Sequence, residues 1–511
     1  MPVRNRKTAT RPKGMTGMDE PTTAQQAFLG PAGILFIGLY VASLLVVGWF
    51  GFRAKKENTL SDFYLGGRNL GFLILLFTLF ATQYSGNTLM GYPGKAYRSG
   101  FQMLFAVAAM VTVTAVLFIY APRLRRMSER RGYVTPGDFI QDRFGSRPLT
   151  TLVTVMGILA LVNYLITNLK VLGYVVENVT GGAIGFEASV CVLAVVMIAY
   201  EAMGGMRSVA WTDVTQGAIL FIGTLVLFFA ALSAYGGTEA LSGTLREQRP
   251  ELWELPDFRM LTTWLGTVIL LGLGNALYPH TVQRIYAARS ERALQRSLQI
   301  MVFMPLFISF LMILIGLMAA ARFPGLEGAG SDRAIMLILR DLAANSALMQ
   351  AVGVVFIAAV IAATMSTIDS ALLSMSAMVT ADLYRPLRPE TPQDQLTRFG
   401  KHATVVVMAA AVTLTIWLKD KTIFAIIVFK HELLIQLAPA LMIGVHWKRL
   451  SATPVFAGML AGTATAVLMT LGLLGPVTKP LGMHAGVWGL FVNLTLLFGL
   501  QAGLRKPTSH E

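Results

Sequence analysis

Long apolar stretches separated by short polar segments recur along the whole chain, and this pattern is the strongest signal in the sequence. A helix needs about 20 mostly apolar residues to cross the hydrocarbon core of a bilayer. Such stretches lie near residues 32–52, 71–96, 101–121, 149–177, 185–203, 212–235, 261–288, 299–321, 349–383, 402–418, 422–445, 452–475 and 485–504. They predict an all-α polytopic membrane protein with about thirteen transmembrane helices. One transmembrane domain would span residues 31–504, between a basic tail at 1–30 and a short tail at 505–511.

The composition supports a membrane protein and excludes several other classes. Only 14% of the residues are charged, whereas a soluble domain carries about a quarter. The polar loops reach only roughly 25 residues, too short for a separate catalytic or DNA-binding domain. Cys191 is the single cysteine, and the six histidines show no metal-ligand spacing. We therefore expect neither an enzyme nor a cysteine or zinc site.

The net charge of +15 predicts an orientation in the membrane. A basic surplus can indicate nucleic-acid binding, but in so apolar a chain it indicates basic loops on the cytoplasmic side. With the N-terminus outside, the inside loops hold about 24 Lys and Arg and the outside loops about 10. The pattern predicts a bacterial inner (plasma) membrane protein with a cytoplasmic C-terminus and no nucleic-acid partner. The basic tail at 1–30 does not fit this orientation, and Met15 and Met18 leave a later start open.

Ionisable residues within the predicted spans are candidates for function, because charges at membrane depth are costly. They are Lys95, Lys170, Asp213, His280, Asp369, Lys430, His431 and Glu432. Lys95 and Asp213 lie near span ends and could reach the interface, while Lys430 and Glu432 could neutralise each other. Lys170 has no acid near it in its span before Glu177, so its ammonium favours an anionic ligand.

Two spans carry residues that permit an interruption of the helix. The second contains the polar run 81–88 followed by Gly91, Pro93 and Gly94, and the seventh contains Gly272, Gly274, Asn275 and Pro279. Unwinding frees carbonyl groups for a cation and amide groups for an anion. Interrupted helices at corresponding positions of two halves are typical of inverted-repeat transporters.

Oxygen-bearing side chains crowd the ninth span between Thr364 and Ser370. Sodium is a hard cation that prefers oxygen ligands, although Ser and Thr also mediate helix packing in membranes. Asp369 favours an ion site, because packing does not need a carboxylate.

From about residue 35 to 450 the sequence resembles the sodium:solute symporter family, whose members carry sugars, proline, sialic acid and pantothenate. The matching motifs are Asp62-Phe63-Tyr64-Leu65-Gly66-Gly67-Arg68, Tyr92-Pro93-Gly94, Trp211-Thr212-Asp213, Gln283-Arg284, Ala363 to Thr367, and Asp382-Leu383-Tyr384. Each is weak alone, and their order makes the resemblance specific. It implies a LeuT-type core of five-plus-five inverted repeats, about 71–236 and 261–445, with one extra N-terminal and two extra C-terminal helices. The ten core helices and three extra helices add up to thirteen, which equals the number of apolar stretches. The fold also implies transport by alternating access.

The resemblance also implies ion sites. The family's common sodium site would use carbonyls of Ala81, Tyr84 and Ala363 and the hydroxyls of Ser366 and Thr367. A second ion site, present in some members, would use Asp213, Ser366, Asp369 and Ser370, with Asp369 standing where a hydroxyl is more usual. Gln83 replaces the acid of the proline branch, which argues against coupling of the proline type.

The substrate site of this family lies between the interrupted helices and the third and tenth core helices. The residues that the resemblance implies there are Gln83, Ser85, Asn87, Thr88, Lys170, Asn275, Lys430 and Glu432. The sialic acid branch holds its carboxylate with a basic residue on the third core helix, where this chain has Lys170. We therefore expect sodium-coupled symport of a small anionic or zwitterionic organic solute, such as a carboxylate or amino acid.

Other functions are left open by the sequence. A proton-coupled permease would use Asp369 or Asp213, and a transporter-like membrane sensor would act with a partner. A channel would need repeated polar rings along a continuous pore, and the sequence has isolated charges instead. The expected partners are a small organic solute, sodium as coupling ion and metal, and the lipid bilayer. The sequence does not predict an oligomeric state.

Overall fold

The structure is a computed structural model that describes residues 59–504 except 255 and 476, together with isolated positions between 29 and 46. The side chains of residues 200–204 are outside this description. The tail at 505–511, most of the tail at 1–30 and most of the first predicted span, 32–52, also lie outside the described residues.

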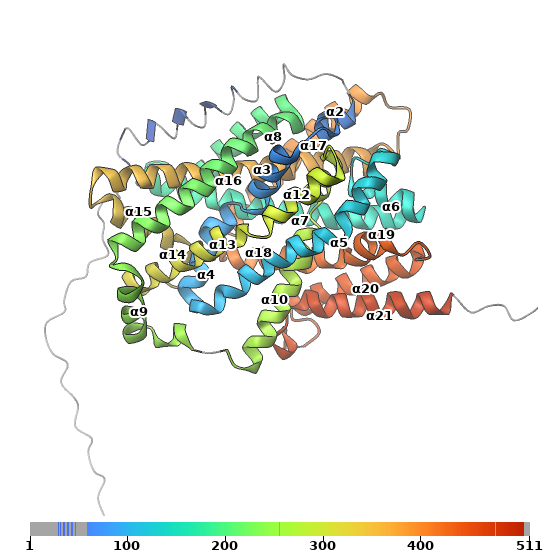
Figure 1. The fold of residues 1–511 in the computed structure, drawn as a ribbon. Coiled ribbons are helices and arrows are strands. Elements are labelled where there is room, and N and C mark those ends of the chain that lie inside the picture. Colours follow the sequence, from blue (N-terminus) through green and yellow to red (C-terminus); the bar gives the residue numbers. More distant parts are fainter. Residues whose placement is uncertain are drawn as a thin grey trace, which may run out of the picture.

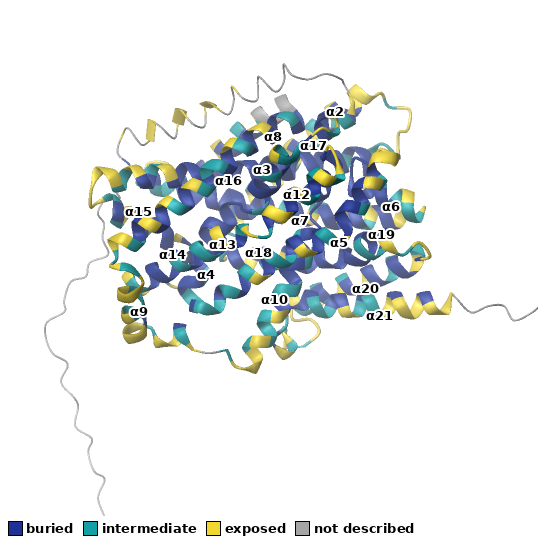
Figure 2. Ribbon diagram, in the orientation of Figure 1, coloured by how far each residue is buried: buried dark blue, intermediate teal, exposed yellow. Residues whose placement is uncertain are grey.

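The described chain is helical throughout its regular elements, and one isolated bridge between Leu70 and Ala288 is the only strand-like pairing there. Long helices lie side by side in one bundle (Figure 1). Buried residues fill its middle, and exposed residues gather at helix ends and in the connections (Figure 2). Large apolar side chains nevertheless face outward, including Trp211, 64% exposed, and Val406, 70% exposed. Such a surface suits lipid rather than water.

The first half of the bundle contains three long helices and one interrupted helix. Its elements are α2 (Leu60–Leu65), η1 (Gly66–Arg68), α3 (Phe72–Gln83), η2 (Asn87–Gly91), α4 (Tyr92–Ser99), η3 (Gly100–Leu104), α5 (Phe105–Arg131), α6 (Pro136–Phe144), α7 (Arg147–Val179), α8 (Phe186–Ala234), α9 (Gly237–Gln248) and η4 (Pro250–Trp253). The fifth and sixth predicted spans together form α8, which is kinked at Gly205. Gly205 has φ +60°, and a Cβ there would lie 2.7 Å from the Phe63 carbonyl oxygen, so glycine is needed at the kink.

The second half begins with another interrupted helix and ends with two further long helices. Its elements are α10 (Phe258–Ala276), α11 (Pro279–Ala287), α12 (Glu291–Met301), α13 (Met304–Phe307), α14 (Ser309–Arg322), η5 (Gly328–Arg333), α15 (Ala334–Ala343), α16 (Ala347–Met378), η6 (Val379–Tyr384), α17 (Gln393–Trp417), α18 (Ile423–Leu434), η7 (Ile435–Leu437), η8 (Pro439–Ile443), α19 (Gly444–His446), α20 (Ala452–Thr470), η9 (Pro480–Gly482) and α21 (Ala485–Gly503). Many of these junctions lie inside predicted spans.

Among the described residues, nine helices are long and apolar enough to cross a membrane, and a bent pair forms a tenth candidate. Two shorter apolar helices, Phe72–Gln83 and Phe186–Ala199, add to them. These lengths agree with a polytopic membrane protein. The count of thirteen and the repeat boundaries at 71–236 and 261–445 stay predictions.

Both predicted interruptions are confirmed. Helix α3 ends at Gln83 because Tyr84 leaves the helical region at φ −108°, ψ 89°, and helical structure resumes at Asn87. Helices α10 and α11 meet at a bend of 48°. At the first interruption a Cβ on Gly86 would lie 2.8 Å from Val171 Cγ1 and closer still to Thr364 Oγ1. Glycine therefore lets this break pack directly against α7 and α16.

Candidate functional site

The predicted sodium site lies where the α3 break meets α16. The Thr367 hydroxyl is 3.5 Å from the Ala81 carbonyl oxygen and donates to the Ala363 carbonyl oxygen at 2.9 Å. Tyr84 directly follows the last residue of α3, so its carbonyl lies at the break. The structure thus brings Ala81, Ala363 and Thr367 together, with Tyr84 one turn from Ala81. These buried oxygens have the chemistry that a sodium ion needs.

Ser366, the fifth predicted sodium ligand, faces a buried ion pair. Its hydroxyl donates to Asp213 Oδ1, and Arg284 Nη2 lies 3.3 Å from Asp213 Oδ2. Arg284 also donates to the Ser370 hydroxyl and, through Nε at 2.9 Å, to Thr78 Oγ1. Asp213 and Arg284 are both fully buried. The expectation that Asp213 could reach the membrane interface is therefore wrong.

The structure brings together three of the four residues of the second predicted ion site, and a positively charged side chain, Arg284, lies among them. Asp213, Ser366 and Ser370 come together around the Arg284 guanidinium group. Asp369 is fully buried, and neither of its carboxylate oxygens has a hydrogen-bond partner within the described chain. In the sequence, Arg284 was noted only as part of a family motif. It could not be placed in the ion site, because a sequence does not show where a guanidinium group points.

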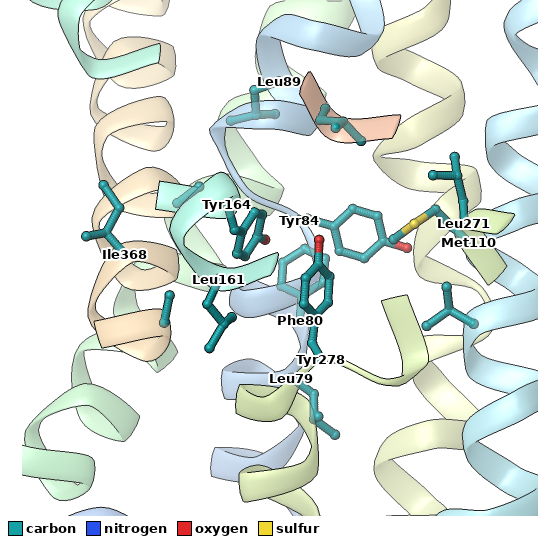
Figure 3. Packing of buried hydrophobic residues seen from close by; sticks show 14 of the residues in the cluster. Leu79, Phe80, Tyr84, Leu89, Met110, Leu161, Tyr164, Leu271, Tyr278 and Ile368 are labelled. Carbon is teal, nitrogen blue, oxygen red and sulfur yellow. The ribbon is translucent and has the colours of Figure 1, made fainter. Parts of the chain in front are cut away.

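A cluster of aromatic rings lies between the interrupted helices and α7. The rings of Tyr164 and Tyr278 stack with centroids 5.0 Å apart, and His280 stacks on Tyr278 at 4.7 Å. Figure 3 shows Tyr84, Tyr164 and Tyr278 beside the break in α3. The Tyr164 hydroxyl donates to the Thr82 carbonyl oxygen at 3.0 Å, which fixes the cluster to that break. We call Tyr164, Tyr278 and His280 the aromatic cluster.

Lys430 points its ammonium group at this aromatic cluster. Its Nζ lies 3.8 Å from the ring centroid of Tyr164 and 5.4 Å from that of Tyr278. The residue is 1% exposed, and no carboxylate of the described residues forms an ion pair with it. A protonated amine over aromatic rings gains a cation–π attraction, but the rings carry no opposite charge that would neutralise it.

Glu432 does not neutralise Lys430. It accepts a hydrogen bond of 2.5 Å from the Thr470 hydroxyl of α20. Two residues that are two positions apart on a helix differ in direction by about 200°. The interpretation of Lys430 and Glu432 as a pair is therefore wrong. Between them, His431 Nε2 lies 2.9 Å from Asn275 Oδ1, so Asn275 contacts α18 through the histidine.

Lys170 has different neighbours from Lys430. Its Nζ donates to the carbonyl oxygens of Lys419, at 2.5 Å, and Lys421. Those carbonyls belong to the connection between α17 and α18. Nearby, Asp332 accepts from the Ile423 backbone N–H at 2.8 Å. Burial raises the pKa of Asp332, and that hydrogen bond and Arg98 act in the opposite direction.

The other predicted substrate residues lie at the α3 break. Asn87 is 4% exposed, and both polar atoms of its side-chain amide lack a partner in the part of the chain described. The Gln83 amide nitrogen is likewise unpartnered, while Ser85 Oγ accepts from the Asn87 backbone N–H at 3.2 Å. Thr88 is buried in the same segment. The sequence marked His280 as an ionisable candidate without placing it in the substrate site, and it did not assign Tyr164 or Tyr278 to the site, because aromatic residues are common in apolar spans.

The chain is similar to known proteins along most of its length. The model of the "Sodium:solute symporter family" matches residues 63–462. The sodium/pantothenate symporter of Escherichia coli (strain K12) is 28% identical over 93% of this chain and 97% of its own length. The high-affinity proline transporter PutP of Bacillus subtilis (strain 168) is 28% identical over 83% of this chain and 89% of its own.

A solved structure of a Na+-coupled sialic acid symporter, bound to substrate in an outward-open state, superposes with a TM-score of 0.76. It is 20% identical and covers 94% of this chain and all of its own, which shows a shared fold. The fold is therefore LeuT-type. With relatives of this kind along nearly the whole chain, the protein is a multi-pass transporter of the bacterial plasma membrane and not an enzyme. The chain belongs to the sodium:solute symporter family, and sodium is its coupling ion.

Proposed function

We propose that this symporter carries a small organic anion with a carboxylate group, and that Lys430 binds the carboxylate. The observation that carries the proposal is the buried Lys430 ammonium, which faces the aromatic cluster without an acidic partner from the described part of the chain. The name of the sialic acid symporter suits an acidic solute, and those of the pantothenate and proline relatives suit a carboxylate-bearing one.

The free energy of burial supports an anionic ligand at Lys430. Removing a charged group from water without an opposite charge costs several kcal/mol or more. A carboxylate against the ammonium would cancel that charge through a charge-assisted hydrogen bond. The aromatic cluster would pack against the apolar part of the same molecule. Asn87 supports this arrangement, because no described residue pairs with the donor or the acceptor of its buried amide at the adjacent break.

The proposed coupling runs through the α3 break. Sodium would bind to the Ala81 and Ala363 carbonyls and to Thr367, which joins α3 to α16. The same break carries Asn87, so sodium would fix a substrate-binding residue. By thermodynamic linkage, substrate would then raise the affinity for sodium by the same factor. We place the N-terminus outside, as the loop charges predict, so that sodium and solute enter together and leave to the cytoplasm.

Lys170, which the sequence favoured for the carboxylate, is proposed here to hold the connection between α17 and α18 instead. Its ammonium already has two backbone carbonyl acceptors, whereas Lys430 has none among the residues that the structure describes. We therefore assign the substrate carboxylate to Lys430, whose ammonium group lacks the acceptors that Lys170 has.

A thermal-shift screen of the purified protein tests the proposal. The panel contains monocarboxylates, dicarboxylates, amino acids and neutral sugars, each with sodium and with potassium in its place. A bound ligand raises the unfolding midpoint by mass action. We expect carboxylates to give the shift, sodium to increase it, and Lys430→Gln to abolish it.

The matched control is Lys421→Gln, which removes an exposed ammonium near the same helix. It should keep the shift. A neutral ligand that stabilises wild type and Lys430→Gln equally would contradict the proposed substrate class while leaving sodium coupling intact.

A further inference from the structure

A second basic site lies at the end of the bundle predicted to face the cytoplasm. It is a pocket of about 600 Å³ between the last turns of α5, helix α6 and the turn after α19. Six cationic side chains line it, and one acidic one: Arg123, Arg126, Arg130, Arg131, Arg143 and Lys448, with Asp142. None of these residues belongs to the proposed sodium or substrate site.

Three of the six cations are already engaged. Arg131 lies 3.7 Å from Asp142, and Arg126 lies 3.1 Å from Glu291. Arg143 donates to backbone carbonyls after α19, with 2.6 Å to that of Trp447. Glu129, the one acid in α5, pairs with Arg125.

The other three cations lack an acidic partner in the described structure. Arg123 contacts only the ring nitrogen of His446, at 3.4 Å. Arg130 and Lys448 have no hydrogen bond or ion pair to any described residue, and both are exposed. Three positive charges thus share one pocket whose acidic residue, Asp142, is already bound to Arg131 and Tyr133. The positive-inside rule explains an excess of Lys and Arg on the cytoplasmic side, but it does not explain why three of these side chains line the same pocket.

The walls of the pocket are fixed by contacts that do not involve those three cations. Tyr133 is 2% exposed and donates to Asp142 Oδ2 at 2.5 Å. Helix α6 begins in a capping box, in which Thr135 and Asp138 exchange hydrogen bonds. Arg143 then ties this helix to the turn after α19. The free cations therefore project into a pocket with a rigid frame.

An apolar surface adjoins the pocket and indicates the kind of ligand. His446, which contacts Arg123, also bonds through Nε2 to the Ile119 carbonyl oxygen at 3.0 Å. Ile119 is 66% exposed, and Phe498 of α21, which stacks on Trp447, is 47% exposed. A ligand with a phosphate group and acyl chains would satisfy both surfaces, because basic pockets at the cytoplasmic side suit anionic lipid head groups.

We propose that this pocket binds the phosphate head group of an anionic phospholipid, with Arg123, Arg130 and Lys448 as its cationic ligands. The acyl chains lie along the apolar surface beside Ile119 and Phe498. The bound lipid joins α5 and α6 to the turn after α19, so it stabilises the assembled bundle.

The test measures lipid binding to the purified, delipidated full chain by native mass spectrometry and by the unfolding midpoint. The probes are phosphatidylglycerol, cardiolipin, phosphatidylcholine and inorganic phosphate. We expect the two anionic lipids to bind and raise the midpoint, and the other two to give no shift. Replacing Arg123, Arg130 and Lys448 together by Gln should weaken anionic lipid binding about fivefold per cation, or about 100-fold in total.

Two variants make the result specific. Replacing Arg292, Arg296 and Arg388 by Gln removes the same charge from the same predicted side outside the pocket, and should leave binding unchanged. If the pocket triple variant does not fold, Lys448→Gln alone removes no contact of the described structure and should still weaken binding about fivefold. Equal losses in both triple variants, or a full shift with inorganic phosphate alone, would overturn the proposal.

Discussion

At the scale of single residues, the core contains buried charges of two kinds. The Arg284 guanidinium and the Asp213 carboxylate neutralise each other and also bond to Thr78, Ser366 and Ser370. Lys430 and Asp369 are buried without such partners among the described residues. A paired charge holds helices together, whereas an unpaired one is available for an ion or a substrate.

The buried pair predicts a large loss of stability when one partner is removed. Arg284→Met leaves Asp213 charged and buried, which should lower the free energy of unfolding by about 3–5 kcal/mol. Combining it with Asp213→Asn removes both charges and should recover most of that loss. Unfolding midpoints in detergent measure both effects. Equal destabilisation in the single and double variants would show that the loss of stability does not come from the unpaired Asp213 charge.

Asp369 gives a second prediction, which concerns how steeply the uptake rate depends on sodium concentration. Of the second predicted ion site, Asp213 and Ser370 already contact Arg284, and Ser366 donates to Asp213, so Asp369 is the carboxylate left for another ion. If it ligates a second sodium ion, uptake rises sigmoidally with sodium in the wild type and hyperbolically in Asp369→Asn. A hyperbolic dependence in both would limit sodium binding to the site at Thr367.

At the scale of elements, the α3 break is the feature on which both proposed sites depend. Its two sides carry Ala81 and Asn87, and Gly86 between them packs against α7 and α16 without a side chain. The broken segment is therefore held by close packing rather than by helical hydrogen bonds alone. Such a segment can respond to an ion that binds at its carbonyl groups.

Gly86→Ala should disrupt this arrangement. The added methyl group would lie 2.8 Å from Val171 Cγ1 and closer to Thr364 Oγ1. Overpacking of this kind costs about 1–3 kcal/mol and moves the backbone. We expect a lower unfolding midpoint and a loss of sodium-dependent stabilisation. Gly243→Ala is the control, because a Cβ there meets nothing within 4 Å. A Gly86→Ala protein with unchanged sodium response would contradict the role of the break.

The elements also show what the sequence could and could not predict. The two interruptions followed from Gly, Pro and polar residues in apolar spans, because these types weaken a helix wherever they occur. The convergence of Ala81, Ala363 and Thr367 followed from the family motifs. The direction of long side chains did not follow: Lys170 and Lys430 are each the one lysine of an apolar span, and only the folded chain shows which of them reaches the aromatic cluster.

At the scale of the whole molecule, polar contacts at the predicted outer end tie distant segments together. Lys170 holds the connection before α18, Asp332 holds the first residue of α18, and Arg98 lies 3.6 Å from Asp332. Glu187 at the start of α8 adds an ion pair of 3.0 Å with Lys419. These contacts hold α18, and thus Lys430, against the rest of the bundle. Opening on this side requires that some of them break.

This outer cluster predicts that Lys170 controls access more than substrate affinity. In a Cys191→Ser background, Thr88→Cys reports access to the α3 break through its labelling by a membrane-impermeant thiol reagent. Lys170→Met should speed labelling, because the connection before α18 loses its ammonium donor. Lys421→Gln, which keeps the backbone carbonyl, should not change it. Unchanged labelling together with a large loss of substrate affinity would contradict this role. It would support the prediction from the sequence that Lys170 binds the substrate.

The most direct test of the central claim is uptake into proteoliposomes under an imposed sodium gradient. The labelled solute is the carboxylate that gives the largest sodium-dependent thermal shift. We predict uptake that requires sodium, is abolished by Lys430→Gln, and is retained by Lys421→Gln. Sodium-dependent uptake of the same carboxylate by Lys430→Gln, at wild-type rate and affinity, would contradict the account.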